Sequence, residues 1–370
     1  MVDVTRAVDW RSLGPIALVG PLSPPAGGMA NQTRQLAELL QAAHTNVTVV
    51  QTNAPYRPSW VVHLPGVRAI FRLVPYLWTL WIATSRCKVM HLMANSGWSW
   101  HLFAAPAVWV AWLRGVPVVV NYRGGEAERF LLRSQALVRF SVRRASGLIV
   151  PSSFLQGVFA RFGMSASIVP NIVDLARFNP RDARRGDSAH LVVARNLEPL
   201  YDNATALRAF KIVLAKCPEA TLTIAGSGPE DQRLRQLSSE LGLDGRVRFS
   251  GRMDREAMAA LYRSADLMLN PSLADNTPNS VLESWASGVP VVSTNVGGVP
   301  HLVQDGVTAL LVPPADPVAM AAACLKILQD NGLWLRLSAA GLVRVQHFTW
   351  QYVAPLLATA YRQAIETARD

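Results

Sequence analysis

The chain has 370 residues, more than one hydrophobic core usually organises, and this length predicts two domains. Half of the residues are apolar and 16% are charged, which excludes a disordered chain. Cys87, Cys217 and Cys324 lie too far apart for a structural zinc motif, so we predict a reducing compartment and no metal. The net charge of +11 predicts anionic partners. The bases are dispersed and no nucleic-acid-binding motif occurs, so we do not expect nucleic acid among those partners.

The N-terminal region predicts a protein that stays in the cytoplasm. Residues 1–15 lack the apolar stretch of a signal peptide. The longest apolar region, residues 70–83, contains Arg72 and Pro75 and is shorter than the roughly 20 residues that span a bilayer. The bases and aromatic residues that interleave around it are Arg57, Trp60, Arg68, Phe71, Arg72, Tyr76, Trp78, Trp81, Arg86 and Lys88.

This interleaving of bases and aromatic rings has two interpretations. It is typical of segments that lie at a membrane interface, which predicts peripheral contact with the inner face of an anionic membrane. Buried helices whose charged ends reach solvent give the same pattern.

The N-terminal half begins with a predicted strand at 16–19 and a glycine loop. A helical stripe at 29–40 and a strand at 47–50 follow, which together make a βαβ unit. Further strands are predicted at 118–120 and 148–150, as in a parallel sheet. Gly27 and Gly28 in the first loop allow backbone N–H groups to approach a phosphate, although a tight turn explains two glycines equally well.

The C-terminal half repeats the alternation after a predicted linker at 169–187. Strands are expected at 191–194, 221–225, 247–249, 267–270, 289–293 and 309–312. Ligands bind at the carboxyl ends of such strands, so site residues are expected in the loops that follow them. In one such loop, Gly226 either contacts a ligand or belongs to a helix start that Pro229 and Glu230 initiate. The motif GxGxxG is absent, which argues against a nicotinamide-dependent oxidoreductase.

The most informative segment runs from Asn270 to Gly298. A strand leads into a polar loop, a helix begins near Ser280, and Gly288 ends that helix. Asp275 and Glu283 therefore stand on either side of a helix N-terminus. Ser280 and Glu283 also have the spacing of a capping box, which needs no ligand.

This segment resembles the donor-binding segment of the retaining family 4 glycosyltransferases, in which two acids separated by seven positions precede small-Gly-x-Pro-Val-Val and a Gly-Gly loop. The resemblance covers nearly the whole chain. Its other motifs are Pro170-Asn171 with Phe178, residues 226–230, Phe249-Ser-Gly251, Asp305-Gly306 and Phe348-Thr-Trp350.

The resemblance implies an α/β protein of the GT-B fold, with two Rossmann-like, doubly wound parallel-sheet domains that face each other across a cleft. Residues 1–170 would bind the acceptor and residues 171–347 the nucleotide sugar. Residues 348–370 would form a helix that crosses back to the N-terminal domain.

The implied activity is that of a hexosyltransferase, which moves a sugar from a nucleoside-diphosphate sugar to a saccharide or lipid-linked acceptor with retention of configuration. The implied setting is the synthesis of cell-envelope polysaccharide or glycolipid, without a cofactor. Asp275 would contact the sugar, Glu283 the ribose and Arg195 the diphosphate. The remaining residues assigned to the donor are Gly27, Gly28, Gly226, Met253, Asn279, Ser280 and Val281.

Three departures from the family pattern leave a second possibility, a catalytically degenerate scaffold that binds a sugar or nucleotide. The first acid is Asp275 where Glu is usual, and no lysine follows Arg195 before Lys211. Arg123 stands where relatives carry a histidine, and an arginine is a poor base but a good partner for an anion. We assign Arg123 to catalysis. The acceptor-side polar candidates are His91 and Asn121.

Overall fold

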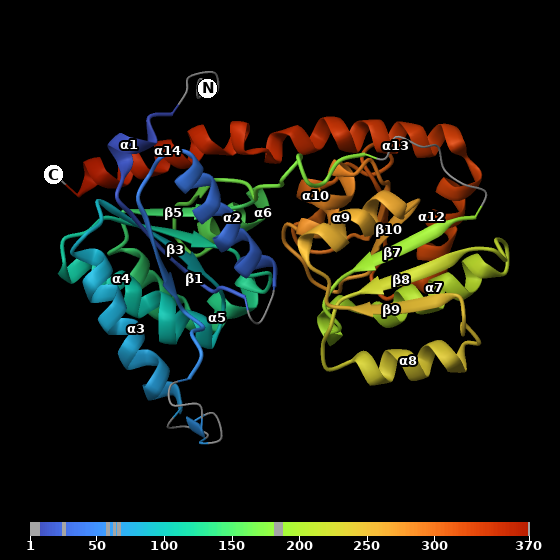
Figure 1. Cartoon of the computed structure of the whole chain (residues 1–370), viewed down its shortest axis with the longest axis horizontal. Coiled ribbons are helices and arrows are strands. Elements are labelled where there is room, and N and C mark those ends of the chain that lie inside the picture. The colour runs from blue at the N-terminus through green and yellow to red at the C-terminus, as the bar shows by residue number, and fades with distance from the viewer. Residues whose placement is uncertain are drawn as a thin grey trace. The chain divides into compact units, whose positions relative to one another are not determined.

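The computed structural model describes residues 8–23, 27–56, 60–61, 64, 68–180 and 188–368. Arg57, the side chain of Arg68 and residues 181–187 of the predicted linker lie outside this description. The chain divides into two units, each shown in Figure 1. Unit 1 comprises Met1–Ile172 with Trp350–Asp370, and unit 2 comprises Val173–Thr349.

Unit 1 contains a six-stranded sheet in the order β2-β1-β3-β4-β5-β6, and all of its pairs are parallel. Its strands are β1 (Ile16–Gly20), β2 (Val47–Gln51), β3 (Val89–Ala94), β4 (Val118–Tyr122), β5 (Gly147–Val150) and β6 (Ser167–Ile168). Its helices are α1 (Trp10–Leu13), α2 (Gly28–Ala42), α3 (Arg68–Thr84), the π-helical turn η2 (Trp100–Ala104), α4 (Ala105–Leu113), α5 (Ala127–Val142), α6 (Ser153–Arg161) and α14 (Trp350–Thr367).

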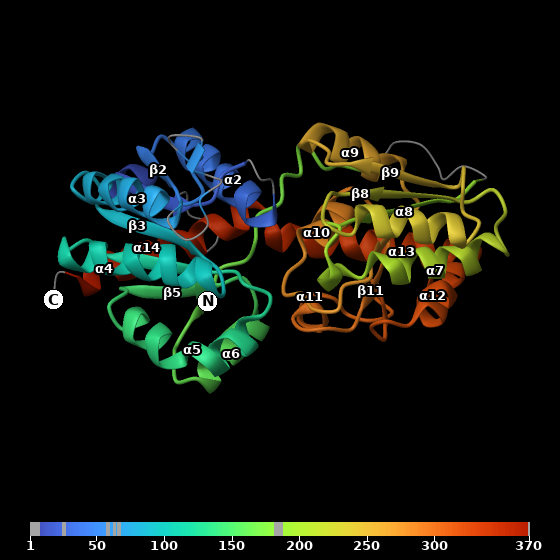
Figure 2. The same cartoon turned by 90° about the horizontal axis from the view of Figure 1, so that it is seen from below.

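Helices cover both faces of this sheet, which explains why its inner strands are apolar throughout. On one face, Ala17, Leu92 and Val120 pack against α3, α4, α5 and α6, and Figure 2 looks onto this side. On the other face, Leu18 and Val119 pack against α1, α2 and α14. The C-terminal helix α14 therefore completes the core of unit 1.

Unit 2 contains a second six-stranded parallel sheet, in the order β12-β11-β10-β7-β8-β9. Its strands are β7 (His190–Ala194), β8 (Thr221–Ala225), β9 (Val247–Gly251), β10 (Leu267–Asn270), β11 (Val291–Thr294) and β12 (Leu310–Val312). Its helices are the 3-10 turn η3 (Pro199–Tyr201), α7 (Asn203–Leu214), α8 (Asp231–Glu240), α9 (Arg255–Ser264), α10 (Asn279–Ala286), α11 (Val299–Leu302), α12 (Pro317–Gln329), α13 (Asn331–Arg344) and the 3-10 turn η4 (Val345–Phe348).

Side-chain alternation along the strands of unit 2 builds two apolar layers. Leu191, Val193 and Leu269 pack against α7, α8 and α12. Val192 and Met268 point to the opposite face, where they pack against α9, α10 and α11. Helices on both faces of a parallel sheet leave its carboxyl edge for loops, and that edge is where the polar side chains gather.

The strands expected from the sequence are confirmed, and two more are present. β3 was not among the predicted runs, since His91 interrupts its apolar residues, and β6 has two residues only. The helix α3 contains the apolar region 70–83 and Pro75. Among the helices of the described residues, none has the length and apolar character that a bilayer crossing requires.

Candidate functional site

The sheet order of unit 2 has one point where the direction of strand addition reverses. β7 and β10 lie side by side, although β8 and β9 lie between them in the chain. In open parallel sheets, ligands bind outside the carboxyl ends of strands at such a point. Arg195 follows β7, and the loop that carries Asp275 follows β10. The topology thus brings together two residues that stand 80 positions apart in the sequence.

Arg195 lies at the centre of this group of polar side chains. Its guanidinium forms an ion pair with Asp275, and its Nε donates to Asn270 Oδ1 at 2.7 Å. It also lies over the ring of Tyr201, 4.8 Å from the centroid. The Arg195 and Asp275 side chains are only 11% and 12% exposed. Burial lowers the pKa of Arg195, and Tyr201, Tyr262 and Glu283 oppose that shift.

Two glycine loops hold the backbone on either side of this ion pair. A side chain at Gly226 would collide with the carbonyl of Arg195. A side chain at Gly297, whose φ is +53°, would likewise collide with the carbonyl of Asp275, and one at Gly298 with the carbonyl of Asn276. Gly298 N also donates to Asp275 O at 2.9 Å. Both glycine motifs are therefore required by packing. The predicted ligand role of Gly226 is not needed to explain why it is glycine.

Glu283 lies on α10, next to the ion pair. Its Oε2 accepts a hydrogen bond from Tyr262 Oη at 3.3 Å. Burial raises the pKa of Glu283 to about 7, while Tyr262, Arg255 and Arg195 oppose that rise. The carboxyl group therefore changes its charge near neutral pH, where most glutamates are fully ionised.

The start of α10 does not form a capping box. Pro278 is the N-cap residue and makes no side-chain cap, and Glu283 bonds to Tyr262 instead. Ser280 is the second helical residue, and its Oγ is buried without a hydrogen-bond partner in the described part of the chain. Val281 N already donates to Pro278 O at 3.1 Å, so its N–H is engaged within the helix. The capping-box alternative was wrong, and the buried hydroxyl of Ser280 remains available to a ligand.

Several members of this group were not recognised in the sequence. Asn270 ends an apolar strand, and a polar residue at such a position was the one available signal. Tyr262 and Arg255 lie on α9, whose amphipathic pattern reads as an ordinary surface helix. Met253, predicted to contact the donor, accepts from Ser250 Oγ at 3.4 Å and packs against the apolar layer below α9.

In unit 1, Arg123 follows β4 and is held entirely by neutral groups. Its Nε donates to Asn121 Oδ1 at 3.2 Å, and its Nη1 donates to Asn171 Oδ1 at 2.6 Å and to Gln32 Oε1 at 3.3 Å. Burial lowers the pKa of Arg123 to about 10, so the group stays charged at neutral pH. No carboxylate pairs with Arg123 among the residues that the structure describes.

His91, predicted as an acceptor-side polar residue, lies inside a strand and not in a loop after one. It is the third residue of β3 and is fully buried. Its Nδ1 pairs with Tyr361 Oη at 2.8 Å and its Nε2 with Asn121 Nδ2 at 3.1 Å. Burial and the charge of Arg123 lower the pKa of His91 to about 3, which keeps it neutral. Asn121 is buried too and bonds to both His91 and Arg123, so the side chains of His91 and Asn121 are enclosed, and Asn121 helps to hold Arg123.

Gly27 is the N-cap residue of α2, in extended backbone and without a side-chain cap. A Cβ atom there would meet open space, in contrast to Gly226. Packing therefore does not require this glycine. The N-terminus of a helix attracts anions, so the predicted approach of a phosphate to Gly27 and Gly28 stays a prediction that fits the local geometry.

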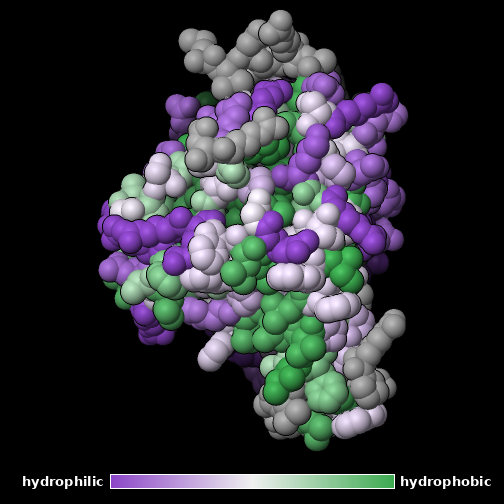
Figure 3. Space-filling view, turned by 90° about the vertical axis from the view of Figure 1, so that its left-hand side faces the viewer, coloured by the Kyte–Doolittle hydropathy of each residue, from purple (hydrophilic) through white to green (hydrophobic). Residues whose placement is uncertain are grey.

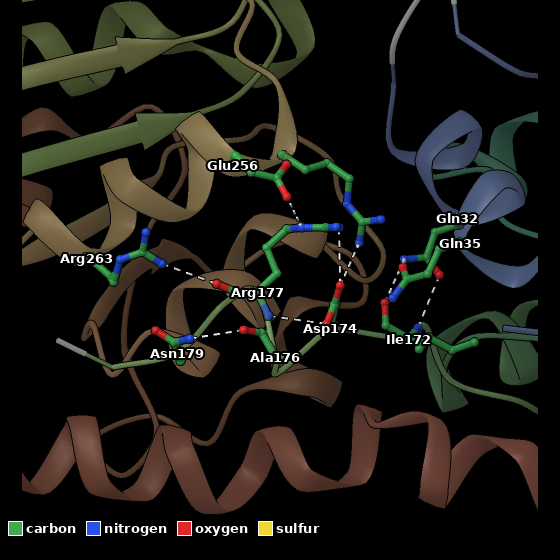
Figure 4. Close-up of polar contacts among 10 residues, drawn as sticks. Gln32, Gln35, Ile172, Asp174, Ala176, Arg177, Asn179, Glu256 and Arg263 are labelled. Atoms are coloured by element: carbon green, nitrogen blue, oxygen red, sulfur yellow. Dashed lines mark hydrogen bonds and ion pairs between the residues drawn. The ribbon is translucent and has the colours of Figure 1, made fainter. Parts of the chain in front are cut away.

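Polar contacts fix the chain on each side of the division between the units (Figure 4). In unit 1, Gln32 donates to Ile172 O at 2.8 Å and accepts from Ile172 N at 3.2 Å. In unit 2, Arg177 pairs with Asp174 at 3.2 Å and with Glu256 at 2.8 Å. Gln32 thus binds both Arg123 and Ile172, the last residue before the chain enters unit 2.

Comparisons with known proteins agree with this architecture. Residues 26–177 match the family model described as Glycosyltransferase Family 4, and residues 190–330 match that described as Glycosyl transferases group 1. The chain is 28% identical to the phosphatidyl-myo-inositol mannosyltransferase of Mycolicibacterium smegmatis, over 94% of this chain and 93% of that protein.

Two solved structures extend the likeness to the fold. Sucrose-phosphate synthase from Thermosynechococcus elongatus has a TM-score of 0.75 at 22% identity, over 95% of this chain and 99% of that one. Anabaena HepE, in complex with UDP and glucose, has a TM-score of 0.69 at 20% identity, over 96% of this chain and 99% of that one.

Two six-stranded parallel sheets with interleaved helices define the GT-B class of proteins. The two family models together match most of both units, and the chain belongs to family 4 of the glycosyltransferases. It is a retaining glycosyltransferase that uses nucleoside-diphosphate sugars. The fold, the family and the enzyme class predicted from the sequence are confirmed.

Proposed function

We propose that unit 2 binds the nucleoside-diphosphate sugar at the carboxyl edge of its sheet, around Arg195, Asp275 and Glu283. The observation that carries this proposal is the Arg195–Asp275 ion pair at the point where the strand order reverses, beside a helix start with an unpartnered buried hydroxyl. These groups match the parts of such a donor. A cation and a helix N-terminus suit the diphosphate, and two carboxyl groups suit hydroxyls.

The proposed roles follow from this chemistry. Departure of the nucleoside diphosphate places negative charge on its phosphates, and fixed donors stabilise that charge best when they are already in place. Arg195 and the start of α10, with Asn279 and Ser280, serve the diphosphate. Asp275 takes the sugar and Glu283 the ribose. HepE, whose structure contains UDP and glucose, makes a uridine nucleotide the first donor to test.

A protein base is not needed if the leaving phosphate takes the proton of the acceptor hydroxyl. The neutral and enclosed state of His91 supports this, since a histidine with both ring nitrogens bonded cannot accept that proton. No lysine follows Arg195 before Lys211, and Tyr201, whose ring lies against Arg195, adds no positive charge to this region.

For the acceptor, we propose a saccharide or lipid-linked saccharide bound by unit 1, in the synthesis of cell-envelope polysaccharide or glycolipid. Arg123 would hold an anionic group, because its charge has no carboxylate partner among the described residues. The relative from M. smegmatis transfers mannose to a phosphatidyl lipid, according to its name. A lipid-linked acceptor would place the protein in peripheral contact with the cytoplasmic face of an anionic membrane.

Thermal unfolding with a panel of nucleotides and nucleotide sugars tests the donor site without an acceptor. A ligand at 100 times its Kd stabilises the folded protein by roughly 2.7 kcal/mol. We expect one nucleotide sugar to raise Tm and Glu283→Ala to remove that rise. Glu256→Ala, which removes an exposed carboxylate of the same unit, is the matched control.

The alternative function, a scaffold without turnover, is motivated by the absent lysine. This alternative also predicts that one nucleotide sugar raises Tm. It further predicts that the protein neither transfers sugar from that nucleotide sugar nor slowly hydrolyses it. A folded protein that responds to none of the nucleotides would contradict both functions.

A further inference from the structure

Three consecutive helices of unit 1 expose large apolar side chains. Along α3, residues at spacings of three and four leave one side of the helix open, and Trp78 is 67% exposed. The opposite side of α3, with Tyr76 and Leu80, is buried in the core. We name the exposed set the aromatic face, and its residues are Ile70, Val74, Trp78, Trp81 and Ile82 on α3, Trp112 and Leu113 on α4, and Leu132, Leu137 and Phe140 on α5.

Arginines connect the three helices within the aromatic face. Arg114, at the end of α4, lies 4.6 Å from the ring centroid of Trp81 on α3. Arg144, just after α5, lies 4.0 Å from Phe140 and 5.4 Å from Trp112. The rings and guanidinium groups therefore form one band across α3, α4 and α5. Figure 3 shows apolar surface gathered over the lower part of this side of the molecule.

The α3 and α4 part of this band carries basic residues and no acidic ones. The sequence contains no aspartate or glutamate between Glu38 and Glu126, whereas Arg72, Arg86, Lys88 and Arg114 all fall in that interval. The next acids along the chain already have partners, since Glu126 pairs with Arg129 at 3.5 Å and Glu128 with Arg161 at 3.0 Å. The band is thus apolar, aromatic and cationic together.

This combination selects one kind of partner. An apolar patch of this extent is unusual on a soluble monomer and marks an interaction surface. Tryptophan and arginine are side chains with an apolar body and a polar tip, which suits the boundary between acyl chains and headgroups. A second copy of this chain is disfavoured, because two identical faces would bring like charges together. Lipid phosphates, by contrast, complement the arginines.

We propose that the aromatic face docks on a membrane surface that contains anionic lipids, with the tryptophans and leucines inserted at headgroup level. This inference rests on the membrane contact in the proposed function and names the surface that makes it, and it depends on no residue of the donor site. That surface includes parts of α4 and α5 that sequence patterning had not indicated.

Flotation of the full chain with lipid vesicles tests the proposal. We expect binding to vesicles of phosphatidylcholine with phosphatidylglycerol, at least tenfold tighter than to phosphatidylcholine alone, and weakened by added salt. The double variant Trp78→Ser, Trp112→Ser should lose at least tenfold in binding, since it removes two exposed rings. Arg114→Gln with Arg144→Gln should abolish the preference for the anionic lipid.

The matched control is Leu335→Ser with Val343→Ser, which removes two exposed apolar side chains from α13 in unit 2. The proposal is overturned if this control loses as much binding as the tryptophan variant, or if the wild type ignores anionic vesicles. A wild type that is dimeric by light scattering, and monomeric after Trp78→Ser, Trp112→Ser, would instead assign the face to a second copy. The rise in Tm with a nucleotide sugar should persist in every variant, which separates this proposal from the donor site.

Discussion

Arg123 in unit 1 and Arg195 in unit 2 occupy similar places, each directly after an inner strand of a six-stranded parallel sheet. Each donates from Nε to an asparagine oxygen, at 3.2 Å to Asn121 and at 2.7 Å to Asn270. They differ in the rest of their surroundings. Arg195 has a carboxylate partner in Asp275, whereas the other partners of Arg123 are amide oxygens.

This difference in counter-ions predicts a different electrostatic response to an anionic ligand at each arginine. A half-buried cation without a counter-ion is held at a cost, because the lost hydration is not replaced by an opposite charge. Binding of an anion to Arg123 would relieve that cost. At Arg195 the charge is already neutralised by Asp275. If the proposed roles hold, a diphosphate would have to share the arginine with Asp275, and one ion pair would couple the sugar and phosphate contacts.

The largest effect is expected from Arg195→Ala. Removal of a fixed donor to the leaving group costs roughly 2.7–4 kcal/mol of transition-state stabilisation, or about 10²–10³ in kcat. The variant also leaves the largely buried carboxylate of Asp275 without its partner, so the free energy of unfolding should fall. Both quantities are measured by donor hydrolysis or transfer and by urea unfolding. Arg235→Ala, which breaks an exposed pair with Asp231, should change neither.

A smaller and more selective effect is expected from Arg123→Ala. Loss of a charge-assisted hydrogen bond costs roughly 1.5–3 kcal/mol, which corresponds to about 10–150-fold in kcat/KM for an anionic acceptor. The rise in Tm with the nucleotide sugar should persist, because Arg123 lies outside unit 2. If Arg123→Ala removed nucleotide binding, the assignment of the two ligands to the two units would be wrong.

The pH dependence of nucleotide binding sharpens the comparison within unit 2. Burial raises the pKa of Glu283 to about 7, above its unfolded value of 4.5. Its contribution to stability is therefore fully present below pH 4.5 and is lost as the pH rises to 7. Binding of ribose hydroxyls favours the carboxylate, so nucleotide affinity should fall about tenfold per pH unit below 7 and level off above it. Calorimetric titration at several pH values measures this, and Glu283→Gln should give a flat profile.

The sequence predicted most of the fold because inner parallel strands are continuous apolar runs, and those runs are local features. Arg195, Asp275 and Glu283 were found from their spacing and from the family resemblance. Tyr262, Asn270 and Gln32 were not, since their roles come from contacts between elements far apart in the chain, such as Gln32 with Ile172. His91 was misplaced for the same reason. Nothing near it in the sequence shows that Tyr361, 270 positions away, would enclose it.

The smallest effects should come from two buried tyrosines that are hydrogen-bonded to a titratable partner, Tyr361 to His91 and Tyr262 to Glu283. Tyr361→Phe and Tyr262→Phe should each lower the free energy of unfolding by about 1 kcal/mol, the usual net value of a hydrogen bond. Only Tyr262→Phe should affect the nucleotide. Since the Tyr262 hydroxyl opposes the raised pKa of Glu283, its removal should move the pH profile of nucleotide affinity upward. Tyr361→Phe should leave that profile in place, and a shift there would mean that the two arginine sites are coupled.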